Sequence, residues 1–550
     1  MFSKNPCKQM SIYDTLHDMP KYLRDYLLNS WAHVFNEKIF PAINEKRFSV
    51  LYSDKGSRPN SPVNVIIGAL LLKEIFNLTD EQLIGSIYFD KRFKYALRLI
   101  GEDKPPVSFN TFTNFRNRVY DYLEDTGIDL IQEEIKSLAD IICEHLEIDN
   151  KNVRIDSFMI SSSCKNMSRI ELIYTVNLQF VKVLKEKFND LIPEECECYL
   201  QEGHKKDTIY RTKNKEVETK IEFLLKHSKA LYEAGKKAGK EITQTQEFKS
   251  LKRMLGEQTK GDDDFDNIEP KDSGNLSSDS LQNPNDPDAT FRYKYDVNIG
   301  YVANVIEAFD GNNAVLKNYD LKPNIYSDQA FCKDSIKTLN KDKSLIFDSK
   351  IKNQKLEPDN DNFLSKLVNV FVDGTYYSFE LGMKALEHGV NLIPGELTGK
   401  KPSPDKIHLC EFEIDDNNKV KKCPEGHTPD FSIFHEDTKF HNARFSKDIC
   451  DNCPIKNLCR VEEIKNAYSI RFTEKEYFYS NLRKKMETKD YKNLTNQRAG
   501  IEGIPSVFRR KYNIDNLPVM GKVRSKIWLG FKVGAINIKR LFSKFQVQGV

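Results

Sequence analysis

Two aspartates stand at the ends of apolar strands, where an acidic side chain is not expected, and a glutamate stands near the start of a predicted helix. Asp156 lies in VRIDS and Asp373 in VFVDG, each after an apolar run, and Glu502 lies in RAGIEGIPSVFRRKY. Burying a carboxylate among hydrocarbon is costly unless a cation or several donors compensate it. Taken singly, each has an ordinary explanation: an Asx cap, an Asp-Gly turn, or an i, i+4 ion pair with Arg498. Taken together, they are hard oxygen ligands that suit Mg²⁺ or Mn²⁺, and two such ions can catalyse displacement at phosphorus.

Cationic side chains surround the glutamate in the sequence. One arginine precedes Glu502 by a helical turn and a basic run follows it by one to two turns; these residues are Arg498, Arg509, Arg510 and Lys511. They could hold a DNA backbone beside the metal ions. Residues 501–550 contain ten Lys or Arg against two acidic residues. This density indicates a polyanion partner, because such cations release the counterions condensed on phosphates. A solvated basic face without a ligand is the alternative.

Four cysteines between Asp373 and Glu502 have the spacing of a metal site. They lie in CPEGHTP and SKDICDNCPIKNLC and are Cys423, Cys450, Cys453 and Cys459. Thiolates at this spacing can close a tetrahedral structural zinc site, and the glycine in the first segment lets backbone amides turn toward sulfur. An iron-sulfur cluster and unligated thiols are the alternatives. His427 and Cys410 are spare ligands.

The N-terminal part has helical periodicity. Ser61-Pro62 predicts a helix start before VNVIIGALLLKEIF, and TDEQ at 79–82 has the form of a capping box that opens a second helix. A third helix is expected over SFNTFTNFRNRVYDYLED, with an apolar stripe made by Phe109, Phe112, Phe115 and Val119. A short helix, a turn and a helix bearing Arg116 and Arg118 would suit a helix-turn-helix reader of DNA. An ordinary helical pair with exposed arginines is the alternative.

The centre of the chain alternates strands and helices, which predicts an α/β fold. A strand is expected over 151–160, around Asp156, and a long helix over about 166–190. The stretch from 196 is hydrophilic and partly helical, and the tract at 261–290, with nine acidic residues and one lysine, is expected to be disordered. Further strands fit YKYDVNIGYVANVIEAFD, AVLKNYDL, LVNVFVDGTYYS and Val390–Ile393, and further helices fit Asp328–Leu339, the region around Glu502, and Lys526–Leu541.

Composition limits the class of protein. The 550 residues are 39% hydrophobic and 30% charged, which is typical of soluble multi-domain proteins. The richest apolar run, Val63–Leu72, is far shorter than the roughly 20 residues that a bilayer span needs. Eleven cysteines are too few for a disulfide scaffold, and their grouping favours a reducing compartment. A cytoplasmic, nucleoid-associated protein without membrane contact is therefore expected. No Gly-rich loop ends in Gly-Lys-Ser/Thr, so ATP is not an expected cofactor.

These segments together resemble the DDE transposases of bacterial insertion sequences, in the branch that carries a cysteine-rich insertion. The resemblance covers most of the chain. It rests on FPAINEKRFSVLYSDKGSRPNSPVNVIIGALLLKEIFNLTDEQL, SFNTFTNFRNRV, VRIDS, LVNVFVDGTYYS, RAGIEGIPSVFRRKYNI and GFKVGAINIKRL. The family signature around the glutamate is a Tyr, an Arg, the Glu and then a Lys. It is matched at Arg498 and Glu502, whereas Thr495 stands at the tyrosine position and Arg509 at the lysine position.

The resemblance implies a catalytic triad of Asp156, Asp373 and Glu502 on a ribonuclease H-like mixed sheet, and two bound Mg²⁺ or Mn²⁺ ions. Metal-activated water would cut at the element end, and the exposed 3′ hydroxyl would then attack target DNA. The implied partners are the terminal inverted repeats and target duplex, bridged by a homodimer. The alternatives are a non-catalytic repressor derived from a transposase and a related ribonuclease H-like metal nuclease.

The domain organisation expected on this basis has four parts. They are a helical DNA-binding domain over 1–145, the first part of the catalytic core over 146–394 with an insertion at about 195–290, a small cysteine-rich zinc-binding insertion over 395–485, and the C-terminal helices of the core over 486–550. The third carboxylate and the basic end lie in the last part.

Overall fold

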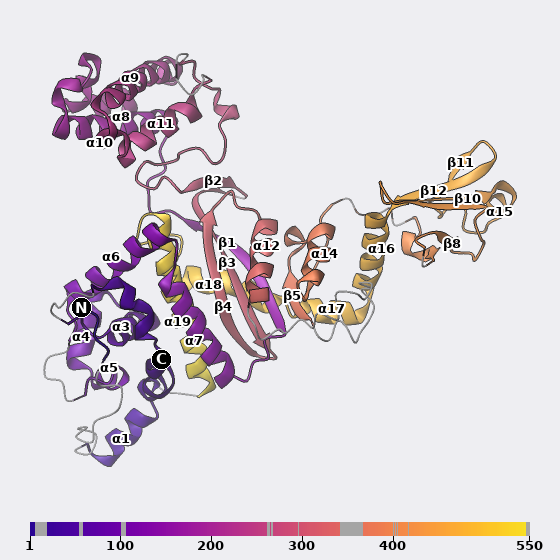
Figure 1. Cartoon of the computed structure of the whole chain (residues 1–550), viewed down its shortest axis with the longest axis horizontal. Coiled ribbons are helices and arrows are strands. Elements are labelled where there is room, and N and C mark those ends of the chain that lie inside the picture. Colours follow the sequence, from indigo (N-terminus) through magenta and orange to yellow (C-terminus); the bar gives the residue numbers. More distant parts are fainter. Residues whose placement is uncertain are drawn as a thin grey trace. The chain divides into compact units, whose positions relative to one another are not determined.

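The computed structural model describes residues 1–5, 19–53, 59–100, 106–260, 265, 268–294, 296–341, 367–399, 401, 403, 405–415 and 417–545 (Figure 1). The chain forms two compact units, which are described separately. Unit 1 comprises Met1–Asp149, Ser157–Ser327 and Ile504–Val550, and unit 2 comprises Asn150–Asp156 and Asp328–Gly503. Strand β1 (Asn152–Ser161) and helix α18 (Ala499–Tyr512) each contribute residues to both units.

Unit 1 begins with the helical region that the sequence predicts. Its helices are α1 (Lys21–Leu28), α2 (Trp31–Val34), η1 (Phe35–Ile39), η2 (Phe40–Ala42), η3 (Glu45–Leu51), α3 (Val63–Phe76), α4 (Asp80–Phe89), α5 (Lys91–Ala96), α6 (Phe109–Thr126) and α7 (Leu130–His145). The capping box at the start of α4 is confirmed, because Thr79 and Gln82 exchange side-chain to backbone hydrogen bonds. Helix α3 begins one residue later than Ser61-Pro62 predicts, since Pro62 is its N-cap.

The apolar stripe of α6 is confirmed in part. Phe112, Phe115 and Val119 are buried, but Phe109 is 56% exposed. Phe109 is the first residue of the helix, where the side chain projects beyond the packed turns, so its predicted place in the stripe is wrong.

Helix α19 (Lys522–Lys544) packs against α3 and α7. Two glycines permit this close approach. A Cβ on Gly534 would lie 2.7 Å from Ile135 Cδ1 and 2.8 Å from Leu71 Cδ2, and a Cβ on Gly530 would overlap the Tyr319 hydroxyl. The spacing of these glycines in GFKVGAINI is therefore explained by helix packing within unit 1.

The sheet is mixed, as the sequence predicts. Its strands are β1, β2 (Thr290–Tyr293), β3 (Val297–Asp310), β4 (Asn313–Pro323), β5 (Val368–Val372) and β6 (Val390–Pro394). They follow the order β2-β3-β1-β5-β6, with β4 also paired to β3. Strand β3 is antiparallel to β2 and β4, whereas β5 is parallel to both β1 and β6. Nearly all of β5 and β6 is buried, which agrees with their continuous apolar sequence.

A helical module between β1 and β2 has its own hydrophobic core. Its helices are α8 (Arg169–Lys187), η4 (Asn189–Leu191), η5 (Glu194–Leu200), η6 (Lys206–Tyr210), η7 (Asn214–Glu216), α9 (Val217–Ala238), α10 (Lys240–Thr243), α11 (Gln246–Gln258) and η8 (Ser273–Asn275). The core joins α8 side chains such as Phe180 to α9 and α11 side chains such as Leu225 and Leu251. It therefore includes α8, which lies before the insertion that is expected at about 195–290.

The acidic tract departs from the predicted disorder. Residues 261–264, 266 and 267 lie outside the described residues, but 268–290 follow a defined course. Asp286 is 1% exposed and accepts hydrogen bonds from Ser162 Oγ (2.5 Å) and from the Tyr301 hydroxyl. Burial raises the pKa of its carboxyl. Arg253 donates to the backbone oxygens of Asp279 (2.7 Å) and Pro287 (2.6 Å). Specific polar contacts, which composition does not reveal, order this segment.

Unit 2 surrounds β5 and β6 with helices and extends into a small β module. The remaining elements are α12 (Asp328–Lys341), η10 (Gly374–Tyr376), α14 (Phe379–Glu387), η11 (Leu409–Glu411), β7 (Glu413–Ile414), β8 (Val420–Lys422), β9 (Phe431–His435), β10 (Phe440–Ser446), α15 (Lys447–Asp451), β11 (Glu462–Ile464), β12 (Ala467–Thr473), α16 (Glu474–Glu487) and α17 (Lys489–Asn496). We call residues 409–473 the cysteine module. Its antiparallel sheet has the order β11-β12-β10-β9 and packs on a core that includes Phe412, Phe445 and Phe472.

Within the described residues, no helix has the length and apolar character that crossing a membrane requires.

Candidate functional site

Two neighbouring parallel strands of unit 2 place the two aspartates. The pairing of β1 with β5 sets Arg154 level with Phe371. Continuing this register by two residues brings Asp156 level with Asp373, on the same face of the sheet. Asp373 is the first residue after β5, and its Oδ1 accepts a hydrogen bond from the Gly374 N–H (2.8 Å). The predicted strands therefore bring these two candidate ligands to adjacent positions.

Arg498 joins the third carboxylate to the first. Its Nη1 donates to Glu502 Oε1 (2.8 Å), and its Nη2 lies 3.7 Å from Asp156 Oδ1. The Arg498 and Asp156 side chains are only 16% and 18% exposed, whereas Glu502 is 59% exposed. The i, i+4 ion pair between Arg498 and Glu502 is thus present. An isolated ion pair of this kind does not explain why Arg498 also lies beside Asp156, which is far away in the sequence. All three carboxylates belong to unit 2.

Arg154 fixes the turn that leads into α18. Its Nη1 donates to the backbone oxygen of Gln497 (2.7 Å), the C-cap residue that follows α17. The same guanidinium lies against Gly500, where any added Cβ would overlap it. The sequence analysis identified neither Arg154 nor Gly500 as a functional residue. A signal existed for Arg154, because it lies two residues before Asp156 and so on the same face of the strand.

A hydrogen bond to the end of β6 fixes helix α17, which precedes the turn into α18. The buried Tyr491 of α17 donates its hydroxyl to the backbone oxygen of Pro394 (2.9 Å), the last residue of β6. Just beyond, Glu396 lies against Gly374, since a Cβ on that glycine would be 2.7 Å from the Glu396 backbone oxygen. Sequence reasoning also missed Glu396. The carboxyl ends of parallel strands meet at one edge of a sheet, so a carboxylate after β6 was a recognisable candidate.

The arginines predicted to bind DNA on α6 differ in their surroundings. Arg116 donates to both carboxylate oxygens of Asp80 (2.8 and 2.6 Å), which also pairs with Lys73 (2.8 Å). Burial alone would raise the pKa of Asp80, but these cationic hydrogen bonds hold it below its ordinary value. Arg118 is exposed and lies over the Tyr52 ring, 4.9 Å from its centroid. Arg116 is thus held in an internal ion pair, whereas Arg118 faces the surface of unit 1.

The basic run of α18 is exposed. Arg509, Arg510 and Lys511 occupy its last turn, where cations interact favourably with the helix dipole. Arg509 lies 3.5 Å from Asp515, and both side chains are about half exposed. The last turn of α18 is therefore a cationic surface.

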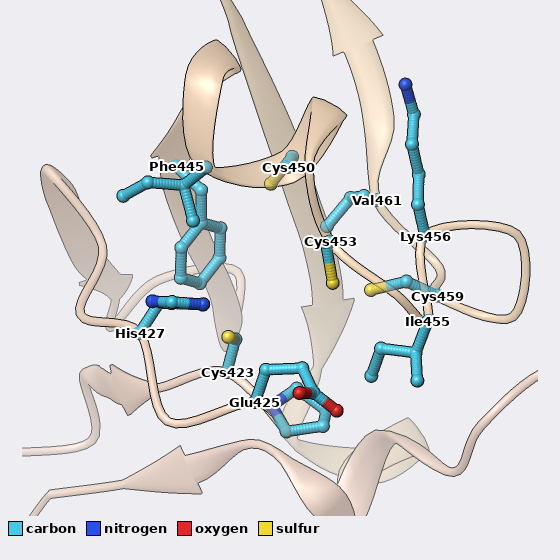
Figure 2. A pocket seen from close by; sticks show the side chains of 12 residues that line it. Cys423, Glu425, His427, Phe445, Cys450, Cys453, Ile455, Lys456, Cys459 and Val461 are labelled. Atoms are coloured by element: carbon cyan, nitrogen blue, oxygen red, sulfur yellow. The ribbon is translucent and has the colours of Figure 1, made fainter.

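One pocket of the cysteine module collects the four predicted thiols (Figure 2). It is lined by Cys423, Cys450, Cys453 and Cys459 together with His427. Figure 2 shows the sulfur atoms of Cys453 and Cys459 turned toward one another. None of the four forms a disulfide. Burial and the neighbouring thiols raise the pKa of Cys450 to about 11.

The turn that carries Cys423 is tight. The Cys423 N–H donates to the His427 backbone oxygen (2.9 Å), and the Gly426 N–H donates to the Cys423 backbone oxygen (2.8 Å). Gly426 has a φ of 81°, which explains the glycine. The spare candidate Cys410 lies on η11, where its N–H donates to Ser480 Oγ (3.1 Å).

As the side chains stand, no group of three or more His, Cys, Asp or Glu in the described part of the chain is arranged to hold a metal ion. Bound zinc and bound magnesium or manganese stay predictions.

Two family models match the chain. The model described as Transposase domain (DUF772) matches residues 25–118, and the model described as Transposase DDE domain matches residues 422–542. Both models describe transposase domains, and the two matches support a DDE transposase of an insertion sequence. This confirms the resemblance. No curated protein and no solved structure matches the chain.

The two matches cover different parts of the transposase. The first runs from within α1 to about the middle of α6, and the second runs from the cysteine pocket through Glu502 and into α19. Asp156 and Asp373 lie outside both ranges. Transposases act on DNA as cleaving and joining enzymes in general, and their DDE domains generally use divalent metals. The catalytic roles of Asp156 and Asp373 are therefore argued from the strand register and contacts described above.

Proposed function

We propose that this transposase binds the terminal inverted repeats of its own element and catalyses metal-dependent DNA strand cleavage and strand transfer, with Asp156, Asp373 and Glu502 as its triad. The observation that carries the proposal is the shared partner Arg498. It contacts Glu502 at 2.8 Å and lies 3.7 Å from Asp156, while the β1–β5 register brings Asp373 level with Asp156. These contacts support the proposal because they relate three carboxylates from segments that are far apart in the sequence; side-chain rotation would still have to bring them together around metal ions.

The sheet supports a ribonuclease H-like core in this proposal. It combines an antiparallel pair, β3 and β4, with the parallel strands β1, β5 and β6. Asp156 lies on β1, and Asp373 directly follows its parallel neighbour β5. On this basis we assign 146–394 and 486–550 to the catalytic core, 1–145 to DNA binding and 395–485 to the insertion.

The protein supplies position and charge compensation. Divalent ions, when bound, would activate the attacking oxygen and stabilise the leaving oxygen. Arg498 offsets the mutual repulsion of Asp156 and Glu502 and keeps the Glu502 side chain turned toward β1. Arg154 holds the turn just before this arginine, and Tyr491 holds α17 on the end of β6. Such positioning is the main contribution that a protein makes to phosphoryl transfer.

The same proposal assigns DNA contacts to exposed cations. Arg118 and the last turn of α18, with Arg509, Arg510 and Lys511, are exposed and would contact phosphates. Arg116 would have to exchange Asp80 for a phosphate, so Arg118 is the stronger candidate on α6. Helices α4 to α6 would form the helix-turn-helix, and a homodimer would bridge the two element ends.

The test is incubation of the purified protein with a plasmid that carries its gene and native flanks, in Mg²⁺ or in EDTA, followed by sequencing of new ends. We expect Mg²⁺-dependent cuts at paired inverted repeats. Binding without cuts would favour the non-catalytic repressor. Scattered cuts without end specificity would favour the nuclease.

We also propose a structural zinc ion in the cysteine pocket, with Cys423, Cys450, Cys453 and Cys459 as its ligands. The residue types fit, all four side chains line one pocket, and none is consumed by a disulfide. Side-chain rotation would have to draw the sulfurs together. The ion would shape the cysteine module and take no part in the chemistry.

Cys453→Ser should remove zinc and lower the Tm of the protein by at least about 5 °C, because the free energy of metal binding contributes directly to folding. Elemental analysis and a thermal melt measure the two effects. Cys410→Ser is the matched control, since this cysteine lies on η11, and we expect it to keep the metal. Equal zinc content in Cys453→Ser and wild type would end the zinc assignment, and iron in place of zinc would indicate a cluster.

A further inference from the structure

One face of the sheet in the cysteine module is open. The inward residues of β10 and β12, such as Phe445 and Phe472, pack on the module core, and helix α16 and strand β8 contact the sheet. The alternate residues point to the opposite face. Strand pairing sets Phe431 beside Arg444 and Arg471 beside Asn442 on this opposite face. We call it the open face and define it by Phe431, Ile433, Phe440, Asn442, Arg444 and Arg471.

The open face carries two aromatic and cationic pairs. The guanidinium carbon of Arg444 lies 5.3 Å from the centroid of the Phe431 ring, and that of Arg471 lies 5.9 Å from the Phe440 ring. Phe431 is 44% exposed, and both arginines are exposed. An exposed aromatic ring beside exposed cations offers both a stacking surface and positive charge to a ligand.

The charge of this face selects an anionic ligand. Within the described residues, neither arginine forms a salt bridge. Glu463 of β11 is engaged by Lys447 at 2.7 Å, and Glu462 stands exposed at the edge strand, opposite Ser469. The centre of the face is therefore cationic, with one carboxylate at its rim. Such a surface favours the binding of a polyanion, because phosphates would pair with the two arginines, which have no carboxylate partner among the described residues.

The shape of this face favours single-stranded over duplex nucleic acid. The major groove of duplex DNA admits a helix or a two-stranded ribbon, which is narrower than this sheet. An open antiparallel sheet with aromatic side chains instead suits unpaired bases, which stack on aromatic rings and on guanidinium planes.

We propose that the open face binds unpaired nucleotides of DNA, with bases stacked at the Phe431–Arg444 and Phe440–Arg471 pairs. The inference rests on the proposed function, since the strand bound here would come from DNA that the transposase opens or cuts. It adds a DNA-binding surface outside the triad, the N-terminal helices and the basic turn of α18.

The test measures the affinity of the full-length protein for two fluorescent probes, a single-stranded oligothymidine and a duplex element end, at low and high salt. Phe431→Ala and Phe440→Ala should each weaken oligothymidine binding about tenfold. Arg444→Gln combined with Arg471→Gln should also reduce the salt dependence of that binding. Duplex affinity should change less than about twofold. Arg483→Gln on α16 is the matched control, because its guanidinium also lies 5.9 Å from an aromatic ring, that of Tyr479.

The outcomes separate this inference from the proposed function. Unchanged oligothymidine affinity in the phenylalanine variants, with an unchanged circular dichroism spectrum, would overturn the open-face proposal even if wild-type protein binds and cuts element ends. Loss of self-association in these variants, with oligothymidine affinity retained, would assign the face to a second copy of the chain and overturn it too. Failure of wild-type protein to recognise any element end would instead count against the proposed function.

Discussion

Replacing Asp373 by asparagine lowers Mg²⁺-dependent strand cleavage by at least about a thousandfold, because the amide lacks the negative charge that binds divalent ions. The substitution preserves shape. The asparagine oxygen can still accept the hydrogen bond that Asp373 Oδ1 accepts from the Gly374 N–H. Affinity for the element end therefore stays within a few fold of wild type. The measurement is single-turnover cleavage of a labelled end, with binding followed separately by gel shift in Ca²⁺.

Asp310→Asn is the matched control for this prediction. Asp310 also ends an apolar strand, β3, and is followed by a glycine, but it is exposed and belongs to unit 1. It should cleave like wild type. Asp156→Asn and Glu502→Gln should lose cleavage as Asp373→Asn does. Any one of these three that cleaves at the wild-type rate does not belong to the triad.

The sequence predicted the elements that carry the site, because each has a strong local signal. The apolar run around Asp156 became β1, the run before Asp373 became β5, and the helical period around Glu502 became α18. Residue type and spacing also identified the four cysteines that share a pocket. These features depend on side chains that are near one another in the chain, so local patterns suffice.

What the sequence did not predict depends on contacts between distant segments. Arg154 meets Gln497 across 343 positions, and no periodicity reports such a pairing. Arg116 carries the residue type of a DNA contact, but the fold turns it toward Asp80. Composition alone suggested disorder for the acidic tract, whereas a few hydrogen bonds, such as those that Asp286 accepts, give part of it a defined course.

The contact between Arg154 and Gly500 leads to the second prediction. Replacing Gly500 by alanine lowers strand cleavage about a hundredfold, although alanine favours a helix more than glycine by about 1 kcal/mol. The new methyl group would overlap the Arg154 guanidinium, which is anchored on the Gln497 backbone oxygen. Either the arginine leaves or the first turn of α18 shifts and carries Glu502 away from Asp156. A displacement of about 1 Å is enough for a loss of this size.

Gly503→Ala provides the control that isolates this effect. It lies in the same helix and changes helix propensity equally. Within the described residues, and apart from the adjoining residues and backbone of its own helix, no atom lies within 4 Å of its added Cβ. We expect it to cleave at the wild-type rate and to raise thermal stability slightly. Equal cleavage by Gly500→Ala and Gly503→Ala would show that the contact with Arg154 does not position the glutamate.

A second change tests the cause of the loss. Arg154→Ala removes the guanidinium that the new methyl group would overlap. The further loss of cleavage that it causes in the Gly500→Ala protein should therefore be much smaller than the loss that it causes in the wild-type protein. The two losses should not add. A misplaced Glu502 should also raise the Mg²⁺ concentration needed for half-maximal cleavage, which a general loss of stability would not do. These two results together would identify Arg154 as a positioning residue. Additive losses with an unchanged Mg²⁺ requirement would instead assign Arg154 and Gly500 to stability alone.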